Sequence, residues 1–403
     1  MPLVNLTAGF LPLFDSLLLV IAKETGLAEA EGISLTLTRE TSWANIRDRA
    51  ALGHFELALM LAPMPIAASL GLTPLATPMI TPVVAGLGNN AITVSAELWR
   101  QMVAAGAPDD LAPGATGSSL AAVVRASPRR LRFAVVHQIS SHNYELRYWL
   151  AASGIRPDQD VEIVVLPPPL LPEALKSGGI DGYCVGEPWN SAGVETAGGH
   201  IATAKALIWQ NSPDKVIGMR ADWAERHPAL VHGVVRAIYR AGEWAADPAN
   251  HPTAARLMSD RRYLDLPETI VERAMAGRLR TGHGQTTIAD FFVPHASAAN
   301  FPWQSHALWY YTQMVRWGEV TASATRADLA RACFRPDIYR AALSKIGVDV
   351  PAMDLKSDGI HATPYTVPGA RGDIAMGPNA FFDGSVFDPD RIDAYLARQS
   401  LND

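Results

Sequence analysis

The sequence predicts an α/β protein with two lobes, each built around a sheet with helices on its faces. The first 190 residues alternate between strand-like and helix-like segments, which is typical of βα units forming parallel sheets covered on both faces. Two series of such units are separated by a Gly- and Pro-containing stretch around residues 106–118, and this separation indicates two lobes. The length of 403 residues suits two or three domains or one large two-lobed one.

The first series opens with a short apolar strand at Val4–Gly9. We expect Asp15 to cap a helix that runs to about Thr25 and ends at Gly26. Period-two alternation over Ile33–Thr38 predicts the second strand. The remaining elements of this series are a helix from Thr41 or Ser42 to Leu52, a strand at Glu56–Met60, a helix opened by Pro63 and Pro65, and strands at Val83–Ala85 and Ala91–Ser95.

The second series repeats the same alternation, and long helical patterns follow it. Its predicted elements are strands at Arg132–Val136, Val161–Leu166 and Gly182–Val185, a helix capped by Ser140 or Ser141 and ended by Gly154, and a helix running to Lys176. Helical patterns then cover His227–Ala246, Pro252–Ser259, Pro267–Leu279 and Phe301–Gly318. The tail after Gly359 has few periodic residues, so we expect an irregular arm packed on the surface.

Composition excludes several classes of protein. A hydrophobic fraction of 48% excludes disorder as the main state. A net charge of −6 disfavours nucleic-acid binding through a basic surface. Cys184 and Cys333 are the only cysteines, which excludes a Cys-rich zinc site and a disulfide framework. The start lacks the basic region and the long apolar run of a secretory signal, so we expect a cytoplasmic protein.

The motifs of common enzymes are missing from the sequence. The glycine cluster Gly114–Ser119 lacks the lysine of a Walker A motif. The pattern Gly86-x-Gly88-x-x-Ala91 matches a dinucleotide fingerprint, but it leads into a predicted strand where the fingerprint requires a helix. We therefore expect a protein that is not an enzyme and that uses no cofactor and no metal.

Polar segments lie where predicted strands meet the starts of helices. In open α/β sheets, ligands bind at the carboxyl ends of the strands, where helix starts present unpaired N–H groups. These N–H groups and the helix dipole favour a small anion. The segments are Thr41–Asn45, Ser140–Tyr144 and Gly186–Asn190.

These segments form part of a longer set of motifs that resembles a known family. The motifs are GFLPLFDS (Gly9–Ser16), SWANIRDR (Ser42–Arg49), LAPMPIAASLGL (Leu61–Leu72), SSHNYELRYWLAASGI (Ser140–Ile155), GYCVGEPWN (Gly182–Asn190) and DKVIG (Asp214–Gly218). Over about residues 5–320, they resemble the solute-binding components of nitrate and bicarbonate importers.

The resemblance implies a type II periplasmic-binding-protein-like fold. Such a fold has two parallel-rich sheets flanked by helices, with a ligand cleft between the lobes. We expect residues 1–92 to form the first part of lobe I and residues 93–214 to form lobe II. Residues 215–403 would return to lobe I and add the C-terminal helices and arm.

The resemblance also implies five nitrate-binding residues. Trp43 is the Trp of the SWxNxRD motif, and His142 is the His of SSHNY. Gly186 is the Gly of VGEPW, and Lys215 is the Lys of the DKVIG-like segment. Asn90 takes the position of an amide in a pattern that reads Asn-Gly-Gln-Ala-Ile-Thr in the family. Here Gly and Asn are exchanged at positions 88 and 89, and the side chain at position 90 is one carbon shorter.

Each of these residues also has an ordinary structural interpretation. Lys215 could be an exposed lysine before a strand, His142 a neighbour of a helix N-cap, and Trp43 a core residue. Nitrate is planar and has no proton, so a site made of donors suits it, whereas the O–H of bicarbonate benefits from an acceptor. A lysine at position 215, where the bicarbonate branch would carry an acidic residue, favours nitrate or nitrite.

Within the family, the sequence resembles the NasS-type cytoplasmic nitrate/nitrite sensors. That resemblance implies a partner protein, an RNA-binding antiterminator of the NasT type, which is held inactive until nitrate or nitrite binds. It implies no direct contact with nucleic acid or membrane. The first alternative is the solute-binding component of an ABC importer for nitrate, bicarbonate or sulfonate. The second is an enzyme of thiamine-pyrimidine synthesis on the same fold, whose Cys-rich motif is missing here.

Overall fold

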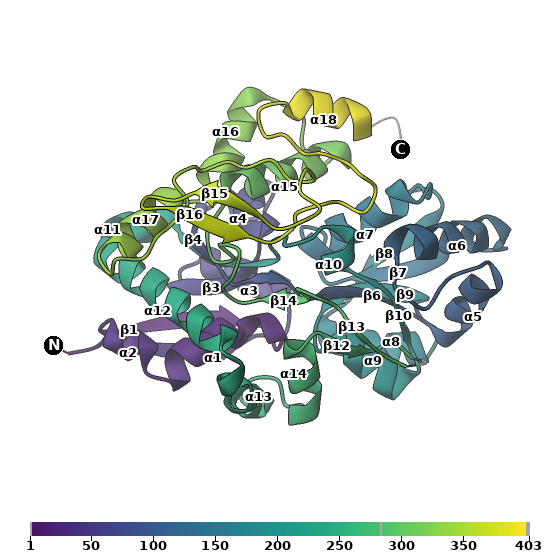
Figure 1. Ribbon diagram of the computed structural model, residues 1–403, viewed down its shortest axis with the longest axis horizontal. Helices are drawn as coiled ribbons and strands as arrows, with labels where there is room; N and C mark the ends of the chain where they lie inside the picture. The colour runs from purple at the N-terminus through teal and green to yellow at the C-terminus, as the bar shows by residue number, and fades with distance from the viewer. Residues whose placement is uncertain (1, 283, 400–403) are drawn as a thin grey trace.

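Two five-stranded mixed sheets organise the molecule, one on the left and one on the right of Figure 1. The computed structural model describes residues 2–282 and 284–399. The strands of the first sheet are, in spatial order, β2 (Ile33–Arg39), β1 (Val4–Phe10), β3 (Leu57–Leu61), β11 (Lys215–Arg220) and β4 (Met79–Val84). Those of the second are β10 (His200–Ala204), β6 (Asn90–Val94), β9 (Gly182–Gly186), β7 (Leu131–Val135) and β8 (Val161–Val165).

Each sheet contains a reversed strand next to a crossing between the lobes. In the first sheet, β1 runs parallel to β2 and β3, whereas β11 is antiparallel to β3 and β4. In the second, β7 is parallel to β8 and β9, whereas β6 is antiparallel to β9 and β10. The expectation of parallel pairing therefore holds only away from the crossings, because a strand that arrives from the other lobe enters its sheet from the opposite end.

The chain crosses between the sheets twice. It leaves the first sheet after β4, passes through β5 (Leu87–Gly88), which pairs with β14 (Phe292–Val293), and enters the second sheet at Asn90. The boundary expected between residues 92 and 93 therefore falls inside β6. The chain returns between β10 and β11 through the short helix α10 (Lys205–Ile208). The division of the chain into lobes at these positions stays a prediction.

Helices cover the faces of both sheets. Before β11 they are η1 (Phe14–Ser16), α1 (Leu17–Glu24), α2 (Leu27–Ala30), α3 (Trp43–Ala51), α4 (Pro63–Ser69), α5 (Ala96–Ala104), α6 (Pro113–Ala126), α7 (Ser141–Ala152), η2 (Pro168–Leu170), α8 (Leu171–Lys176) and α9 (Trp189–Ala197), besides α10. After β11 they are α11 (Ala221–Arg226), α12 (Pro228–Ala246), η3 (Pro248–Asn250), α13 (His251–Ser259), α14 (Glu268–Met275), α15 (Gln304–Arg316), α16 (Ala324–Ala332), α17 (Pro336–Ser344) and α18 (Ile392–Gln399). In the part of the chain that is described, no helix combines the length and apolarity needed to cross a bilayer.

The predicted serine N-caps of α3 and α7 are confirmed. The Ser42 side chain accepts a hydrogen bond from the backbone N–H of Asn45, and Ser140 accepts one from that of Asn143. Both caps have extended backbone angles, as N-cap residues do. They fix the starts of α3 and α7, and so the positions of Trp43 and His142.

The expected cap at Asp15 is wrong. Helix α1 begins at Leu17, and the Asp15 carboxylate instead accepts a hydrogen bond from Asn89 and pairs with Lys215. A buried carboxylate gains more from a lysine than from a helix N-terminus. The helix expected over Pro267–Leu279 is also wrong beyond Met275, because Gly277 adopts a positive φ and the chain continues as a strand, β12 (Arg278–Arg280), paired with β13 (Gln285–Thr287).

The C-terminal tail is more ordered than the sequence suggested. It forms a hairpin of β15 (Tyr365–Pro368) and β16 (Asp373–Met376) and ends in α18, drawn in yellow at the top of Figure 1. Phe381 and Phe387 from this tail are buried, and Phe381 stacks on Trp209. The expected irregular surface arm is therefore a packed part of the core around α15.

Candidate anion-binding site

The five residues carried over from the family lie where the two sheets approach each other. Trp43 is the first residue of α3 and His142 the second residue of α7. Asn90 opens β6, Gly186 ends β9 and Lys215 opens β11. All five are buried. The ordinary interpretation of Lys215 as an exposed lysine is therefore wrong.

Lys215 is the centre of the group. Its Nζ lies 3.5 Å from Nε2 of His142 and 5.6 Å from the centroid of the Trp43 ring. Asn90 and Gly186 face each other in the register of β6 and β9. A Cβ atom added to Gly186 would lie only 3.2 Å from Oδ1 of Asn90, so the glycine permits this close approach.

Four charged residues that were not among the predicted binding residues complete the cluster. Asp15 Oδ2 lies 3.1 Å from Lys215 Nζ, and Lys215 also donates to Asp214. Lys205 donates to Glu145 and, at 2.7 Å, to the carbonyl of Pro213. All four charged side chains are buried. Asp15 and Asp214 lie inside the quoted motifs, and Glu145 directly follows SSHNY. Their positions in the motifs could therefore have marked them as site residues, whereas Lys205 lies in none of the motifs.

Electrostatics keep Lys215 charged and His142 neutral. Burial lowers the pKa of Lys215, but the attraction of Asp15 and Asp214 outweighs it, so the pKa lies above its ordinary value. Burial and the nearby Lys215 hold the pKa of His142 well below its usual range. A neutral imidazole has one donor nitrogen and one acceptor nitrogen. Lys215 and His142 therefore present one fixed cation beside one neutral donor.

Several buried polar atoms of the cluster have no hydrogen-bond partner among the described residues. They include Trp43 Nε1, His142 Nδ1 and Asn90 Oδ1, while Asn90 Nδ2 donates to Glu145 at 2.9 Å. Buried polar groups are nearly always paired in proteins. Since Lys215 Nζ and His142 Nε2 are 3.5 Å apart, one oxygen atom can lie within hydrogen-bonding distance of both. These atoms are what a small oxyanion would satisfy.

The two lobes contact each other directly around this cluster. Trp189 Nε1 donates to the carbonyl of Pro12 at 3.0 Å, and the backbone N–H of Phe14 donates to the carbonyl of Glu187 at 2.8 Å. These bonds join the end of β1 to the start of α9. Opening the cleft would break them, so the structure represents a closed arrangement.

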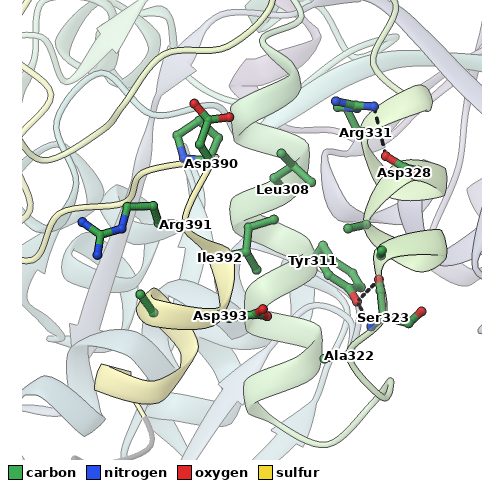
Figure 2. A pocket seen from close by; sticks show the side chains of 14 residues that line it. Leu308, Tyr311, Ala322, Ser323, Asp328, Arg331, Asp390, Arg391, Ile392 and Asp393 are labelled. Carbon is green, nitrogen blue, oxygen red and sulfur yellow. Dashed lines mark hydrogen bonds and ion pairs between the residues drawn. The ribbon is translucent and has the colours of Figure 1, made fainter.

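A separate groove of about 700 Å³ lies between α15, α16 and the start of α18 (Figure 2). Five charged residues line it: Asp328 and Arg331, which pair with each other at 3.0 Å, and Asp390, Arg391 and Asp393. The Tyr311 hydroxyl donates to the Ser323 carbonyl at 3.1 Å.

The two mixed sheets, the two crossings and the buried cluster where the sheets meet define a two-lobed, periplasmic-binding-protein-like fold. The crystal structure of the periplasmic nitrate-binding protein NrtA from Synechocystis PCC 6803 has this fold, with a TM-score of 0.85, 25% identity and 98% of both chains covered. The predicted fold class is confirmed.

The chain belongs to the NMT1-like family, which matches residues 1–259. It is 32% identical to the nitrate/nitrite binding protein NrtA of Synechococcus elongatus, covering 97% of this chain and 85% of that protein. It is 33% identical to the bicarbonate transport ATP-binding protein CmpC of Synechocystis sp., covering 98% of this chain but only 54% of that protein. The resemblance to the importer solute-binding family is confirmed by these relatives, and membership of the sensor branch stays a prediction.

Proposed function

We propose that this protein binds nitrate or nitrite through Trp43, Asn90, His142, Gly186 and Lys215, and that it catalyses no reaction. The observation that carries the proposal is the buried, protonated Lys215, with His142 Nε2 3.5 Å away and the Trp43 ring beside it. A single-charged anion can accept from Lys215, His142 and the Trp43 indole N–H together. The homology to NrtA supports the same ligand class.

Bicarbonate is the second candidate ligand, because the cluster also contains acceptors. Asp15 and Asp214 both lie against Lys215, and either could accept the O–H of bicarbonate. Calorimetric titration with nitrate, nitrite, bicarbonate and sulfate separates the candidates. We expect heat of binding from nitrate or nitrite; binding of bicarbonate alone would reject the nitrate assignment.

Lys215→Ala tests the residue assignment. Removing a buried charge-assisted hydrogen bond costs about 1.5–3 kcal/mol, so nitrate binding should weaken roughly 10- to 150-fold. Because this variant leaves two buried carboxylates without their lysine, it is compared with the charge-balanced double variant Lys215→Ala, Asp15→Asn. Unchanged affinity in both variants would place the anion elsewhere. The control is Lys356→Ala, which removes a buried lysine outside the cleft.

For the biological role, we propose a cytoplasmic sensor of the NasS type, whose nitrate-free state binds an RNA-binding antiterminator of the NasT type. The motif resemblance supports this role, and the net charge of −6 suits a basic protein partner better than RNA. Closing or opening the cleft moves the two lobes, so a surface that includes both would differ between the two states. The importer component is the alternative role, and the names of the relatives support it.

Size-exclusion chromatography with an antiterminator of this type, with and without nitrate, separates the two roles. The sensor role requires a complex that saturating nitrate dissolves. By linkage, the partner must also weaken nitrate binding by the same factor. A complex equally stable in nitrate, or none in either condition, would favour the importer component.

A further inference from the structure

The buried cluster contains more carboxylates than lysines. Asp15, Glu145 and Asp214 face Lys205 and Lys215, and each of the five side chains is at most 3% exposed. With all five ionised, the cluster carries one surplus negative charge. An anion bound at Lys215 would add a second negative charge in a buried place, where uncompensated charge is costly and groups neutralise instead.

The pairing within the cluster identifies the surplus carboxylate. Lys205 donates to Oε1 of Glu145, whose Oε2 accepts from Asn90, so this carboxylate has its own lysine. Lys215 donates to Oδ2 of Asp214, whose Oδ1 accepts from the Ser141 hydroxyl. Asp15 is the third carboxylate, and it shares Lys215 with Asp214.

The surroundings of Asp15 provide no second cation among the described residues. Lys215 faces it from β11, the like charge of Asp214 faces it from the residue before β11, and the neutral Asn89 amide donates to Oδ1 at 3.0 Å. On the β9 side, a Cβ on Gly186 would lie 2.9 Å from Asp15 Oδ2, 3.2 Å from Asn90 Oδ1 and 3.3 Å from Leu13 Cδ2, so Asp15 meets backbone, a neutral amide and an apolar side chain there. Burial accordingly raises the pKa of Asp15, although Lys215 opposes the rise. Lys215 and Lys205 instead hold the pKa of Asp214 low in spite of its burial.

Besides Glu145, whose pKa burial also raises although Lys205 opposes the rise, His142 is another group that could accept a proton. Its Nε2 lies 3.5 Å from Lys215 Nζ, so a protonated imidazole would place two cations side by side in a buried site. Protonating Asp15 neutralises one of the two carboxylates that share Lys215, and it places no two cations side by side. The Asp15 carboxylate is therefore the better proton acceptor.

We propose that Asp15 takes up one proton from solvent when the anion binds, and that the resulting carboxylic acid donates a hydrogen bond to the anion. The net charge of the cluster with its anion then equals that of the empty cluster. This inference rests on the proposed anion binding at Lys215. It adds Asp15 as a sixth binding residue, and it makes affinity dependent on pH.

Titration calorimetry with nitrate tests this proposal. Runs at one pH in two buffers with different ionisation enthalpies, neither a sulfonate nor a phosphate, give the number of protons taken up per anion. At pH values where Asp15 is ionised in the free protein, we expect the uptake of nearly one proton per anion. In that range, the affinity for nitrate should fall by up to about tenfold for each unit by which the pH rises.

Matched variants identify the proton acceptor. Asp15→Asn should abolish proton uptake and make nitrate affinity independent of pH, while Glu145→Gln and His142→Gln should still take up the proton with whatever nitrate they bind. Nitrate binding without proton uptake in the parent protein, or uptake that persists in Asp15→Asn, would overturn the role of Asp15. If nitrate does not bind the parent protein at any pH, the proposed function fails instead.

Discussion

Two buried clusters in this molecule use the same three residue types for different ends. In the cleft, Lys215 donates to Asp214, and His142 Nε2 lies 3.9 Å from Asp214 Oδ2. Under the C-terminal tail, Lys356 donates to Asp358, and Nε2 of His306 lies 3.7 Å from Asp358 Oδ2. In both clusters, burial and the neighbouring lysine hold the pKa of the histidine well below its usual range.

The difference between the clusters is the charge balance. The tail cluster has one lysine for one aspartate. The backbone of Asp358 also pairs with that of Phe387, at 3.0 and 2.8 Å, which joins two stretches of the C-terminal segment. The cleft cluster adds Asp15 to a lysine that already has a carboxylate. A balanced pair needs no further charge to compensate it. The cleft cluster has a surplus carboxylate, Asp15, and in our proposal this carboxylate takes up a proton when an anion binds.

Replacing Asp358 or Asp15 by asparagine should change the free energy of unfolding in different ways, and this is the largest effect that we expect. Asp358→Asn leaves the buried Lys356 without its carboxylate, which should cost about 3–5 kcal/mol of the free energy of unfolding. Asp15→Asn leaves Lys215 paired with Asp214, so it should cost less than about 1 kcal/mol or stabilise the protein. Urea unfolding of both variants at pH 8 measures the difference. Equal losses would show that the two clusters are equivalent.

A buried carboxylate with no lysine partner sharpens the comparison. Glu187, next to Gly186, accepts a hydrogen bond from the Ser191 backbone N–H at 3.2 Å, and burial raises its pKa from 4.5 to about 7. The folded state then binds more protons than the unfolded state between these pH values, so stability falls as pH rises through that window. The loss is complete above pH 7 and amounts to about 3 kcal/mol.

Glu187→Gln should therefore stabilise the protein above pH 7 and flatten the dependence of its unfolding free energy on pH. Glu319, whose pKa burial likewise raises to about 7, should supply part of the dependence that remains. Thermal or urea unfolding from pH 4 to 8 measures both effects. A variant with the same slope as the parent would mean that Glu187 stays ionised in the folded protein.

Local patterns predicted the elements of the fold, and long-range charge contacts account for much of what they missed. Ser42 and Ser140 were recognisable as caps because an N-cap depends on residues three positions away. Asp15 is of a residue type that is common at N-caps, but its partners Asn89 and Lys215 lie 74 and 200 residues further along the chain. Contacts over such distances in sequence cannot be predicted from local patterns. The motifs gave the positions of the donors in the cleft. The surplus of carboxylates over lysines became visible only when the fold brought three motifs and Lys205 together.

The two clusters also offer matched fluorescence reporters, and here we expect the smallest effect. Lys215 Nζ lies 5.6 Å from the centroid of the Trp43 ring, and Lys356 Nζ lies 5.7 Å from that of Trp303. Both indoles are buried beside a lysine, so their chemical surroundings are alike. An anion that accepts a hydrogen bond from Lys215 alters the electric field at Trp43 and gives an acceptor to Nε1 of Trp43, which has no partner among the described residues, whereas Trp303 keeps its surroundings.

Nitrate should therefore change the tryptophan emission of the parent protein and of Trp303→Phe, while Trp43→Phe should lose most of the change. The comparison needs matched variants because the chain has ten tryptophans. A change that survives in Trp43→Phe and disappears in Trp303→Phe would move the anion from the cleft to the tail cluster. Survival in both variants would assign the signal to another tryptophan and remove Trp43 from the proposed site.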